Sequence, residues 1–271
     1  MRIGRATIRS MLFVISPAKS LDYDTPTPEA VAALASRPQF VPQSAELIGI
    51  LKTRSPADIG GLMDISEALA TLNVARYHAW STRFTDRNSK PAVLAFNGDV
   101  YDGLQAATLS LDDLQWAQRH LAILSGLYGV LRPLDRLQPY RLEMGTALEN
   151  DRGGNLYAYW GDTIAEHLNA RSAQLASPVI VNLASQEYFK AAARKVLKPR
   201  VIECQFEDWK NGRYKIISFF AKRARGLMAR HAIQHRIGTP SGLQDFAADG
   251  YAYAPEASEP DRLVFRRRIA G

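Results

Sequence analysis

LAILSGLYGVLRPLDRLQPYRLEMG, residues 121–145, changes character twice within one short stretch. Its first four residues are largely apolar and predict a buried strand that ends at Ser125-Gly126. The remainder sets arginines and acidic residues among prolines, which indicates a constrained polar loop rather than a long helix. Because binding and catalytic residues gather on loops that rigid strands hold in place, we expect a site in this stretch.

Three other apolar runs are each followed by a polar loop, as residues 121–124 are. Residues 11–15, 92–96 and 178–183 each predict a buried strand. Helical patterns separate them, including a helix expected over residues 156–169. Asn211-Gly212 is a strong signal for a two-residue hairpin turn between residues 201–210 and 213–219. The expected fold is therefore α/β with some α+β character, in which helices flank a mixed central sheet.

The composition is that of a globular protein, with 46% hydrophobic residues and no apolar run long enough for a membrane helix. A single cysteine, Cys204, fits a reducing compartment. The net charge is +7, of which Arg2, Arg5 and Arg9 supply three. We expect residues 1–10 to be a disordered basic extension and residues 11–271 to form one domain, without repeats or a long linker.

Serine and proline punctuate the helical pattern of residues 29–80, with expected helix starts at Ser44, Ser55 and Ser66. Ser110 and Asp113 predict a capping box at the start of a further helix. Gly60-Gly61 is expected between helical pieces. It forms either a plain turn or a helix-hairpin-helix of the kind that presents backbone amides to phosphate.

Polar residues that follow the expected strands should meet at one sheet edge. These residues are Lys19, Asp99, Arg132 and Glu187. Asp99 and Asp102 are three apart, which suits either a shared proton or metal, or a simple turn with a helix cap at Asp102.

Arg132 precedes Pro133 and Arg141 follows Pro139-Tyr140, so their backbones are restrained and they lose less entropy on binding an anion. Glu143 is either a general base or the ion-pair partner of Arg141. Gly126 and Gly129 either bring backbone amides to a phosphate or end a strand.

A helix expected from Phe220 separates basic from apolar residues. Its apolar side carries Phe220, Ala224, Leu227 and Met228. Its basic side carries Lys222, Arg223, Arg225, Arg230 and Arg236. No acidic residue balances this side, so we interpret it as an anion-binding face, best suited to the phosphates of duplex DNA.

Metal and cofactor signals are weak. His231 and His235 are spaced to chelate a metal, but no third ligand is nearby, and we expect neither a metal nor a cofactor. Cys204 is expected in a strand core.

Six motifs in the same order make the chain resemble the bacterial YaaA family of peroxide-stress-resistance proteins. They are residues 11–22 (MLFVISPAKSLD), 96–104 (FNGDVYDGL), 124–135 (LSGLYGVLRPLD), 139–145 (PYRLEMG), 182–190 (NLASQEYFK) and 218–230 (SFFAKRARGLMAR).

This resemblance implies a cytoplasmic protein of one α/β domain with an unusual fold and a basic cleft. It also implies a role in limiting damage from peroxide and iron, and duplex DNA binding through that cleft and a helix-hairpin-helix-like element. No catalytic residue carries over from the family.

Two hypotheses follow. In the first, a DNA-binding stress protein contacts phosphates with Lys19, Arg132, Arg141, Lys222, Arg223, Arg225 and Arg230. In the second, an enzyme acts on a nucleotide or a damaged base, with the arginines as phosphate clamps and proton transfer by Glu143, Tyr140 or Asp99. A closed pocket between Arg132, Arg141 and Lys222 would favour the enzyme, and a groove as wide as a duplex would favour DNA.

Overall fold

The strand at the start of the quoted stretch is confirmed. In the computed structural model, which describes residues 10–268, β5 (Leu121–Ser125) is buried throughout and runs parallel to β1 (Leu12–Ile15). β1 also pairs in parallel with β8 (Val179–Leu183). Helices and loops exclude solvent from both faces of these strands, which explains why their sequences are continuous apolar runs.

The central sheet is mixed, as expected, with strand order β11-β12-β9-β8-β1-β5-β6 and with β10 paired to β9. β6, β10 and β11 pair in the antiparallel sense. The remaining strands are β2 (Ser20–Leu21), β3 (Lys90–Pro91), β4 (Phe96–Asn97), β6 (Gly129–Leu131), β7 (Arg136–Leu137), β9 (Arg200–Lys210), β10 (Arg213–Lys215), β11 (Ala252–Tyr253) and β12 (Arg262–Arg267).

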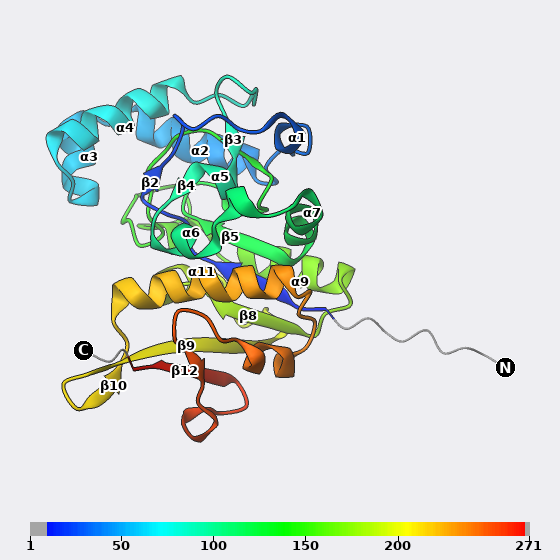
Figure 1. Cartoon of the computed structure of the whole chain (residues 1–271). Coiled ribbons are helices and arrows are strands. Elements are labelled where there is room, and N and C mark those ends of the chain that lie inside the picture. Colours follow the sequence, from blue (N-terminus) through cyan, green and yellow to red (C-terminus); the bar gives the residue numbers. More distant parts are fainter. Residues whose placement is uncertain (1–9, 269–271) are drawn as a thin grey trace.

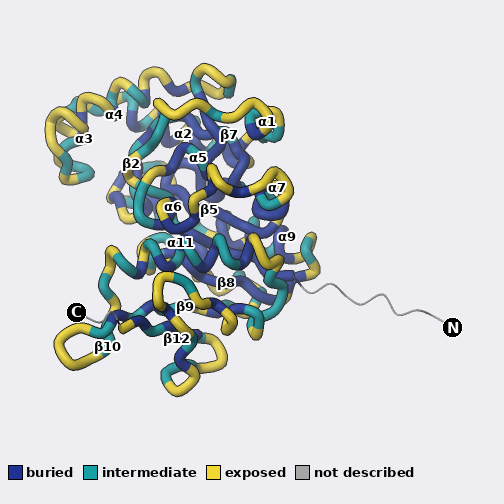
Figure 2. Tube along the Cα trace, in the orientation of Figure 1, coloured by how far each residue is buried: buried dark blue, intermediate teal, exposed yellow. Residues whose placement is uncertain are grey.

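Helices flank the sheet, and the long helix α11 crosses it in front of β8 (Figure 1). Helices α3 and α4 lie at the far end of the molecule and are largely exposed, whereas β5 and β8 are buried (Figure 2). The α-helices are α1 (Glu29–Ala32), α2 (Val41–Lys52), α3 (Pro56–Met63), α4 (Glu67–Ala79), α5 (Ala92–Ala95), α6 (Asp99–Leu104), α7 (Leu111–His120), α8 (Leu156–Trp160), α9 (Thr163–Gln174), α10 (Gln186–Phe189) and α11 (Ser218–Gln234). Short 3₁₀ helices are η1 (Ala106–Thr108), η2 (Pro240–Asp245) and η3 (Pro255–Ala257).

Several helix caps and a hairpin turn that the sequence predicted are confirmed. Ser55 and Ser66 cap α3 and α4, and Ser110 caps α7 in a reciprocal pair with Asp113. Asn211 and Gly212 both have positive φ, at 56° and 78°, which is the geometry of the expected hairpin turn between β9 and β10.

Other expectations about local structure were wrong. Residues 92–96 form the short helix α5 and enter β4 only at Phe96, because a short apolar run does not distinguish a strand from a buried helical turn. Ser44 lies inside α2, where it bonds the Phe40 carbonyl. Gly60 and Gly61 lie within α3, so neither form of glycine turn occurs there; the chain turns instead at Asp64, whose φ is 50°.

Two other element boundaries were also wrong. The helix expected from residue 156 to 169 is interrupted at Gly161, whose positive φ separates α8 from α9. The strand expected to reach residue 219 ends at Lys215, and α11 already begins at Ser218. These boundaries depend on packing against the sheet, which a local pattern does not encode.

One hydrophobic cluster includes buried residues from both the strands and the surrounding helices. The expected basic extension covers residues 1–9, which lie outside the described residues, and Ser10. The Ser10 hydroxyl is buried and donates to the Leu175 carbonyl at 2.8 Å.

Two glycines set the distance between α6 and α11. A Cβ at Gly226 would overlap the Val100 carbonyl oxygen and lie 2.8 Å from the Leu104 nitrogen. A Cβ at Gly103 would overlap the Arg223 carbonyl oxygen. The two helix backbones therefore touch, and this contact fixes the start of α6 relative to the basic side of α11.

Candidate functional site

A cavity of about 370 Å³ lies where β1 and β8 end. It is lined by Ser16, Pro17, Ala18, Lys19, Ser20, Asn97, Gly98, Asp99, Val100, Glu143, Ser185, Glu187, Tyr188, Lys222 and Arg225. We call it the sheet-edge cavity. Because parallel strands deliver their following loops to the same edge, residues far apart in sequence meet there.

Lys19 and Asp99 come together through a small ladder. β2 pairs with β4, with Ser20 opposite Asn97, and this pairing holds the loop after β1 against the start of α6. Gly98 allows the approach, since a Cβ there would lie 3.3 Å from the Ala18 Cβ. The expectation that Lys19 and Asp99 share one sheet edge is therefore confirmed geometrically.

Glu143 is the most connected carboxylate of the cavity. One carboxylate oxygen lies 2.8 Å from the Lys19 ammonium, and the other accepts from Arg141 Nη2 at 3.0 Å. The Arg141 carbonyl in turn accepts the Tyr77 hydroxyl, which anchors the loop. Arg141 does not line the cavity and lies behind Glu143, so Glu143 is its ion-pair partner, one of the two roles considered.

The loop after β8 provides a second carboxylate and two hydroxyls. Glu187 accepts the Gly145 backbone N–H at 2.9 Å, which joins this loop to the end of the quoted stretch. The Ser16 hydroxyl accepts the Ser185 backbone N–H at 2.8 Å. Burial raises the pKa of the neighbouring Tyr188 well above its usual value, so its phenol stays protonated at neutral pH.

Helix α11 forms the opposite wall with Lys222 and Arg225. The lining thus has three cationic side chains, Lys19, Lys222 and Arg225, and three carboxylates, from Asp99, Glu143 and Glu187. The resemblance implied a basic cleft, whereas the charges of this cavity balance, in part because Asp99 and Glu187 lie at the sheet edge where the sequence placed them.

Most of the expected basic face of α11 is engaged inside the protein. Arg223 pairs with Asp249 at 3.1 Å, and Arg236 pairs with Asp113 at 2.8 Å. Arg230 donates to the carbonyls of Leu104 and Gln105 at the end of α6. These three arginines therefore fasten α11 and the residues just after it to their neighbours, whereas Lys222 is exposed and lines the sheet-edge cavity.

Arg132 does not share the cavity, contrary to expectation. β6 runs antiparallel to β5, with Leu131 opposite Ile123, so the chain has returned toward the start of β5 when it reaches Arg132. There Arg132 pairs with the buried Asp135 at 2.8 Å. The predicted geometry, in which Arg132 faces Lys222 across a cleft, is therefore wrong.

Tyr140 and the glycine turn are structural parts of the wall behind the cavity. The Tyr140 hydroxyl lies 2.6 Å from the Ser125 hydroxyl, and burial raises its pKa. The turn between Gly126 and Gly129 is buried, and the Gly126 carbonyl accepts the Trp160 indole N–H at 2.9 Å. The turn ends β5, and its glycines are not open to a phosphate.

Sequence reasoning did not select Ser16, Ser185 or Tyr188 as site residues. All three lie within motifs that flank the ends of β1 and β8, and that position was the available signal. Hydroxyl-bearing residues are common at turns and helix starts, so residue type alone does not separate them from ordinary caps.

Neither a metal centre nor a reactive thiol is evident in the described part of the chain. No group of three or more metal-ligating side chains gathers among residues 10–268. Cys204 is a buried core residue, as expected, and burial raises the pKa of its thiol to about 12. Because the thiolate is the form that reacts with peroxide, Cys204 is poorly suited to direct peroxide chemistry.

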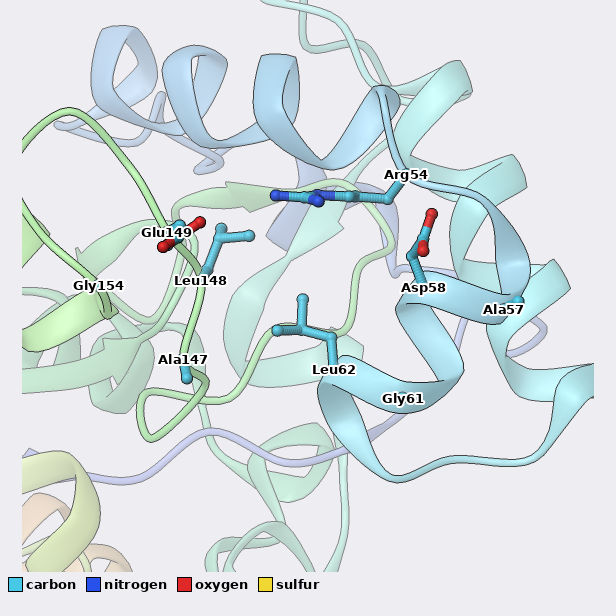
Figure 3. Close-up of a pocket in the computed structure, with 9 residues that line it drawn as sticks. All are labelled: Arg54, Ala57, Asp58, Gly61, Leu62, Ala147, Leu148, Glu149 and Gly154. Carbon is cyan, nitrogen blue, oxygen red and sulfur yellow. The ribbon is translucent and has the colours of Figure 1, made fainter.

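A larger cavity of about 660 Å³ lies between α3 and residues 147–149. Arg54 points across it toward Glu149, and Asp58 lies on the α3 side (Figure 3). Asp58 accepts the Ser55 backbone N–H at 2.8 Å as part of the helix cap. Of the residues singled out from the sequence, this cavity holds Gly61 alone among those that line it, and its polar groups are fewer than those of the sheet-edge cavity.

Comparison with known proteins agrees with the motifs. The family model described as peroxide stress protein YaaA matches residues 11–257. A UPF0246 protein of Paracidovorax citrulli is 63% identical over 96% of this chain and 100% of its own length. Those of Leptothrix cholodnii and Bordetella pertussis are 64% and 60% identical, with the same coverage of both chains.

The match spans every strand from β1 to β11, the sheet-edge cavity and α11. Across residues 10–268 no helix combines the length and apolar character needed to cross a bilayer. The family description supports a role in the peroxide stress response. The chain belongs to the peroxide stress protein YaaA family.

Proposed function

We propose that this chain acts in the peroxide stress response by binding a phosphate-bearing molecule of nucleotide size in the sheet-edge cavity. The observation that carries this proposal is that Lys19 and Lys222, from separate elements and both exposed, line the same cavity at the edge of a parallel sheet. Ligands of α/β proteins commonly bind at this edge. A volume of about 370 Å³ lies within the range of small-molecule sites.

The carboxylates of the cavity favour chemistry in addition to binding. Phosphate recognition alone has no use for Asp99, Glu143 and Glu187 beside two lysines. A phosphate bound to Lys19 would compete with Glu143 for the ammonium group, and the carboxylate would then become available to accept a proton. This arrangement supports an enzyme that acts on a nucleotide or a damaged base.

Duplex DNA is the second candidate ligand. It is supported by the exposure of Lys19 and Lys222 at the cavity mouth and by the net charge of +7. In this alternative the two lysines contact backbone phosphates and the protein limits peroxide and iron damage by covering DNA. Arg132, Arg223 and Arg230 would contribute little, because internal partners hold their side chains.

Binding of a nucleoside 5′-monophosphate and of a short DNA duplex, each measured over a salt series, separates the candidates. We expect the monophosphate to bind, and Lys19→Met and Lys222→Met each to weaken binding about tenfold, since each removes a charge-assisted contact. Lys210→Met is the matched control, because Lys210 is an exposed lysine on the β9–β10 hairpin, outside the cavity. Tight duplex binding that falls steeply with salt, without monophosphate binding, would favour DNA instead.

Glu143→Gln tests whether binding is accompanied by chemistry. If Glu143 transfers a proton, the variant should keep ligand affinity but fail to restore peroxide resistance in cells that lack the protein. Full restoration by Glu143→Gln would mean that binding alone is sufficient.

A further inference from the structure

Arg225 lies between two cavities. Its side chain lines the sheet-edge cavity and also a neighbouring one of about 310 Å³. The second cavity is lined by Asn182, Ala184, Gln186, Phe189, Lys190, Ala193, Glu203, Cys204, Gln205, Phe206, Ile216, Ala221 and Arg225. We call it the α11 cavity. Arg225 is therefore in a position to bind a ligand that enters either space.

The surroundings of Arg225 differ from those of the other arginines on α11. Arg223, Arg230 and Arg236 each have an internal carboxylate or carbonyl partner. Within residues 10–268, no carboxylate or carbonyl lies in bonding range of the Arg225 guanidinium, although that group has five N–H donors. Burial lowers the pKa of Arg225, and the nearby Glu203 only partly opposes this effect.

Arg225 is half-buried, so an anion that docks against its guanidinium gains a charge-assisted contact without breaking an ion pair inside the protein. The planar guanidinium favours ligands with two oxygen atoms, such as phosphate or carboxylate groups. The sheet-edge side supplies further partners for such a group, with the Ser185 hydroxyl and the Lys222 ammonium on the same lining.

Away from Arg225, part of the wall of the α11 cavity is apolar. Phe189 and Ala221 form buried apolar surface there, and Ile216 lies at its edge with 52% of its surface exposed. An exposed isoleucine that borders a cavity offers apolar contact to a ligand ring or chain at little further cost in desolvation.

We infer that Arg225 anchors the oxyanion of a ligand whose apolar or aromatic part occupies the α11 cavity against Phe189 and Ile216. This inference deepens the proposed function and rests on it, because it assigns two parts to the same phosphate-bearing ligand. The phosphate occupies the junction of the two cavities, near Ser185 and Lys222. The rest of the molecule extends beneath the start of α11.

Phenyl phosphate and inorganic phosphate are suitable probes, because they differ only in the apolar ring. Their binding to the full-length protein can be followed by NMR of the arginine Nε–H groups, with the Arg225 signal assigned from an Arg225→Lys variant. We expect both probes to shift the Arg225 signal, and phenyl phosphate to bind about tenfold more tightly than inorganic phosphate. Arg225→Lys should weaken both, because lysine cannot form the two-pronged contact.

A matched pair of surface variants isolates the apolar half of the site. Ile216→Asn should reduce the advantage of phenyl phosphate over inorganic phosphate, with the part due to Phe189 remaining, and leave inorganic phosphate binding unchanged. Phe219→Asn is the control, because Phe219 is also exposed near the start of α11, at 57%, but does not line either cavity.

Equal affinity for the two probes would overturn the inference, as would an unmoved Arg225 signal. Its failure can be distinguished from that of the proposed function. Nucleoside monophosphate binding that depends on Lys19 and Lys222 but is unaffected by Arg225→Lys would preserve the proposed function and refute the role of Arg225. Phosphate binding at Arg225 without any nucleotide binding would refute the proposed function.

Discussion

The two ends of the polar loop over residues 132–145 contain the same chemistry in different surroundings. At one end Arg132 pairs with Asp135 at 2.8 Å, and at the other Arg141 pairs with Glu143 at 3.0 Å. The Asp135 side chain is 1% exposed, whereas that of Glu143 is 21% exposed and borders a cavity. An arginine and a carboxylate on a proline-stiffened loop therefore stabilise the fold at one end and offer a site at the other.

The two carboxylates differ in how many of their hydrogen-bond partners are held inside the protein. Asp135 accepts the Arg132 backbone N–H, the Arg132 guanidinium and the Ser36 hydroxyl, all within the protein. Glu143 bonds Arg141 on one side and the 63% exposed Lys19 on the other. A ligand can displace an exposed lysine but not a buried network, so only the Glu143 end is suited to exchange partners.

The largest expected contrast comes from removing each carboxylate. Asp135→Ala should lower the free energy of unfolding by about 3–5 kcal/mol, because it leaves Arg132 and Ser36 without their buried partner. Glu143→Gln keeps an acceptor for Arg141 and should cost about 1 kcal/mol or less. Chemical denaturation of both variants measures this difference, and equal losses would remove the proposed distinction between the two ends.

Acid should weaken the Arg132 end. Burial, together with Arg171 and Arg132, lowers the pKa of His167 to about 4. Between pH 6.5 and 4 the unfolded chain therefore binds more protons at this residue than the folded chain, and stability falls as the pH falls. Above pH 6.5 His167 is neutral in both the folded and the unfolded chain, and its protonation takes nothing from the free energy of unfolding. Near pH 4 its protonation in the unfolded chain has lowered the free energy of unfolding by about 3 kcal/mol.

Unfolding measured across this pH window tests the role of His167. His167→Gln should flatten the pH dependence relative to the wild type, whatever its effect at neutral pH. An unchanged slope would assign the acid sensitivity to other groups, such as His120, whose pKa burial also lowers.

Changing a glycine between α6 and α11 tests whether their close contact holds the cavity that Glu143 borders in shape, because both helices line that cavity. Gly226→Ala should destabilise the protein by about 2 kcal/mol or more and disrupt ligand binding, because its Cβ would overlap the Val100 carbonyl. Gly49→Ala in α2 is the control, since nothing lies within 4 Å of its added Cβ. That change should be neutral or stabilising by about 0.5–1 kcal/mol, as alanine favours a helix.

The smallest effect is expected for the ion pair of Lys19 with Glu143. A double-mutant cycle with Lys19→Met and Glu143→Gln should give a coupling of about 0.2–1 kcal/mol, because the ammonium is exposed. A coupling near that of a buried pair would mean that Lys19 is a structural residue, and it would weaken the case for ligand exchange at this end.

Much of the fold followed from local sequence. The apolar runs of β1, β5 and β8, the hairpin at Asn211-Gly212 and the cap at Ser110 were all predicted correctly. The run at residues 92–96 was misassigned, because both a strand and a buried helical turn satisfy its pattern. The convergence of Lys19 and Glu187 was also predictable, since β1 and β8 are parallel and deliver their loops to one edge. Asp99 joins them for another reason, the pairing of β2 with β4.

The sequence by itself determined the strands, the family and the residue types that a site would use. Only the tertiary structure decided which of those residues meet. β6 reverses direction and carries Arg132 away from the cavity, while the glycine contact brings Lys222 and Arg225 toward Asp99. Charge and spacing are local properties of a chain, but whether an arginine is open to a ligand depends on partners that are distant in sequence.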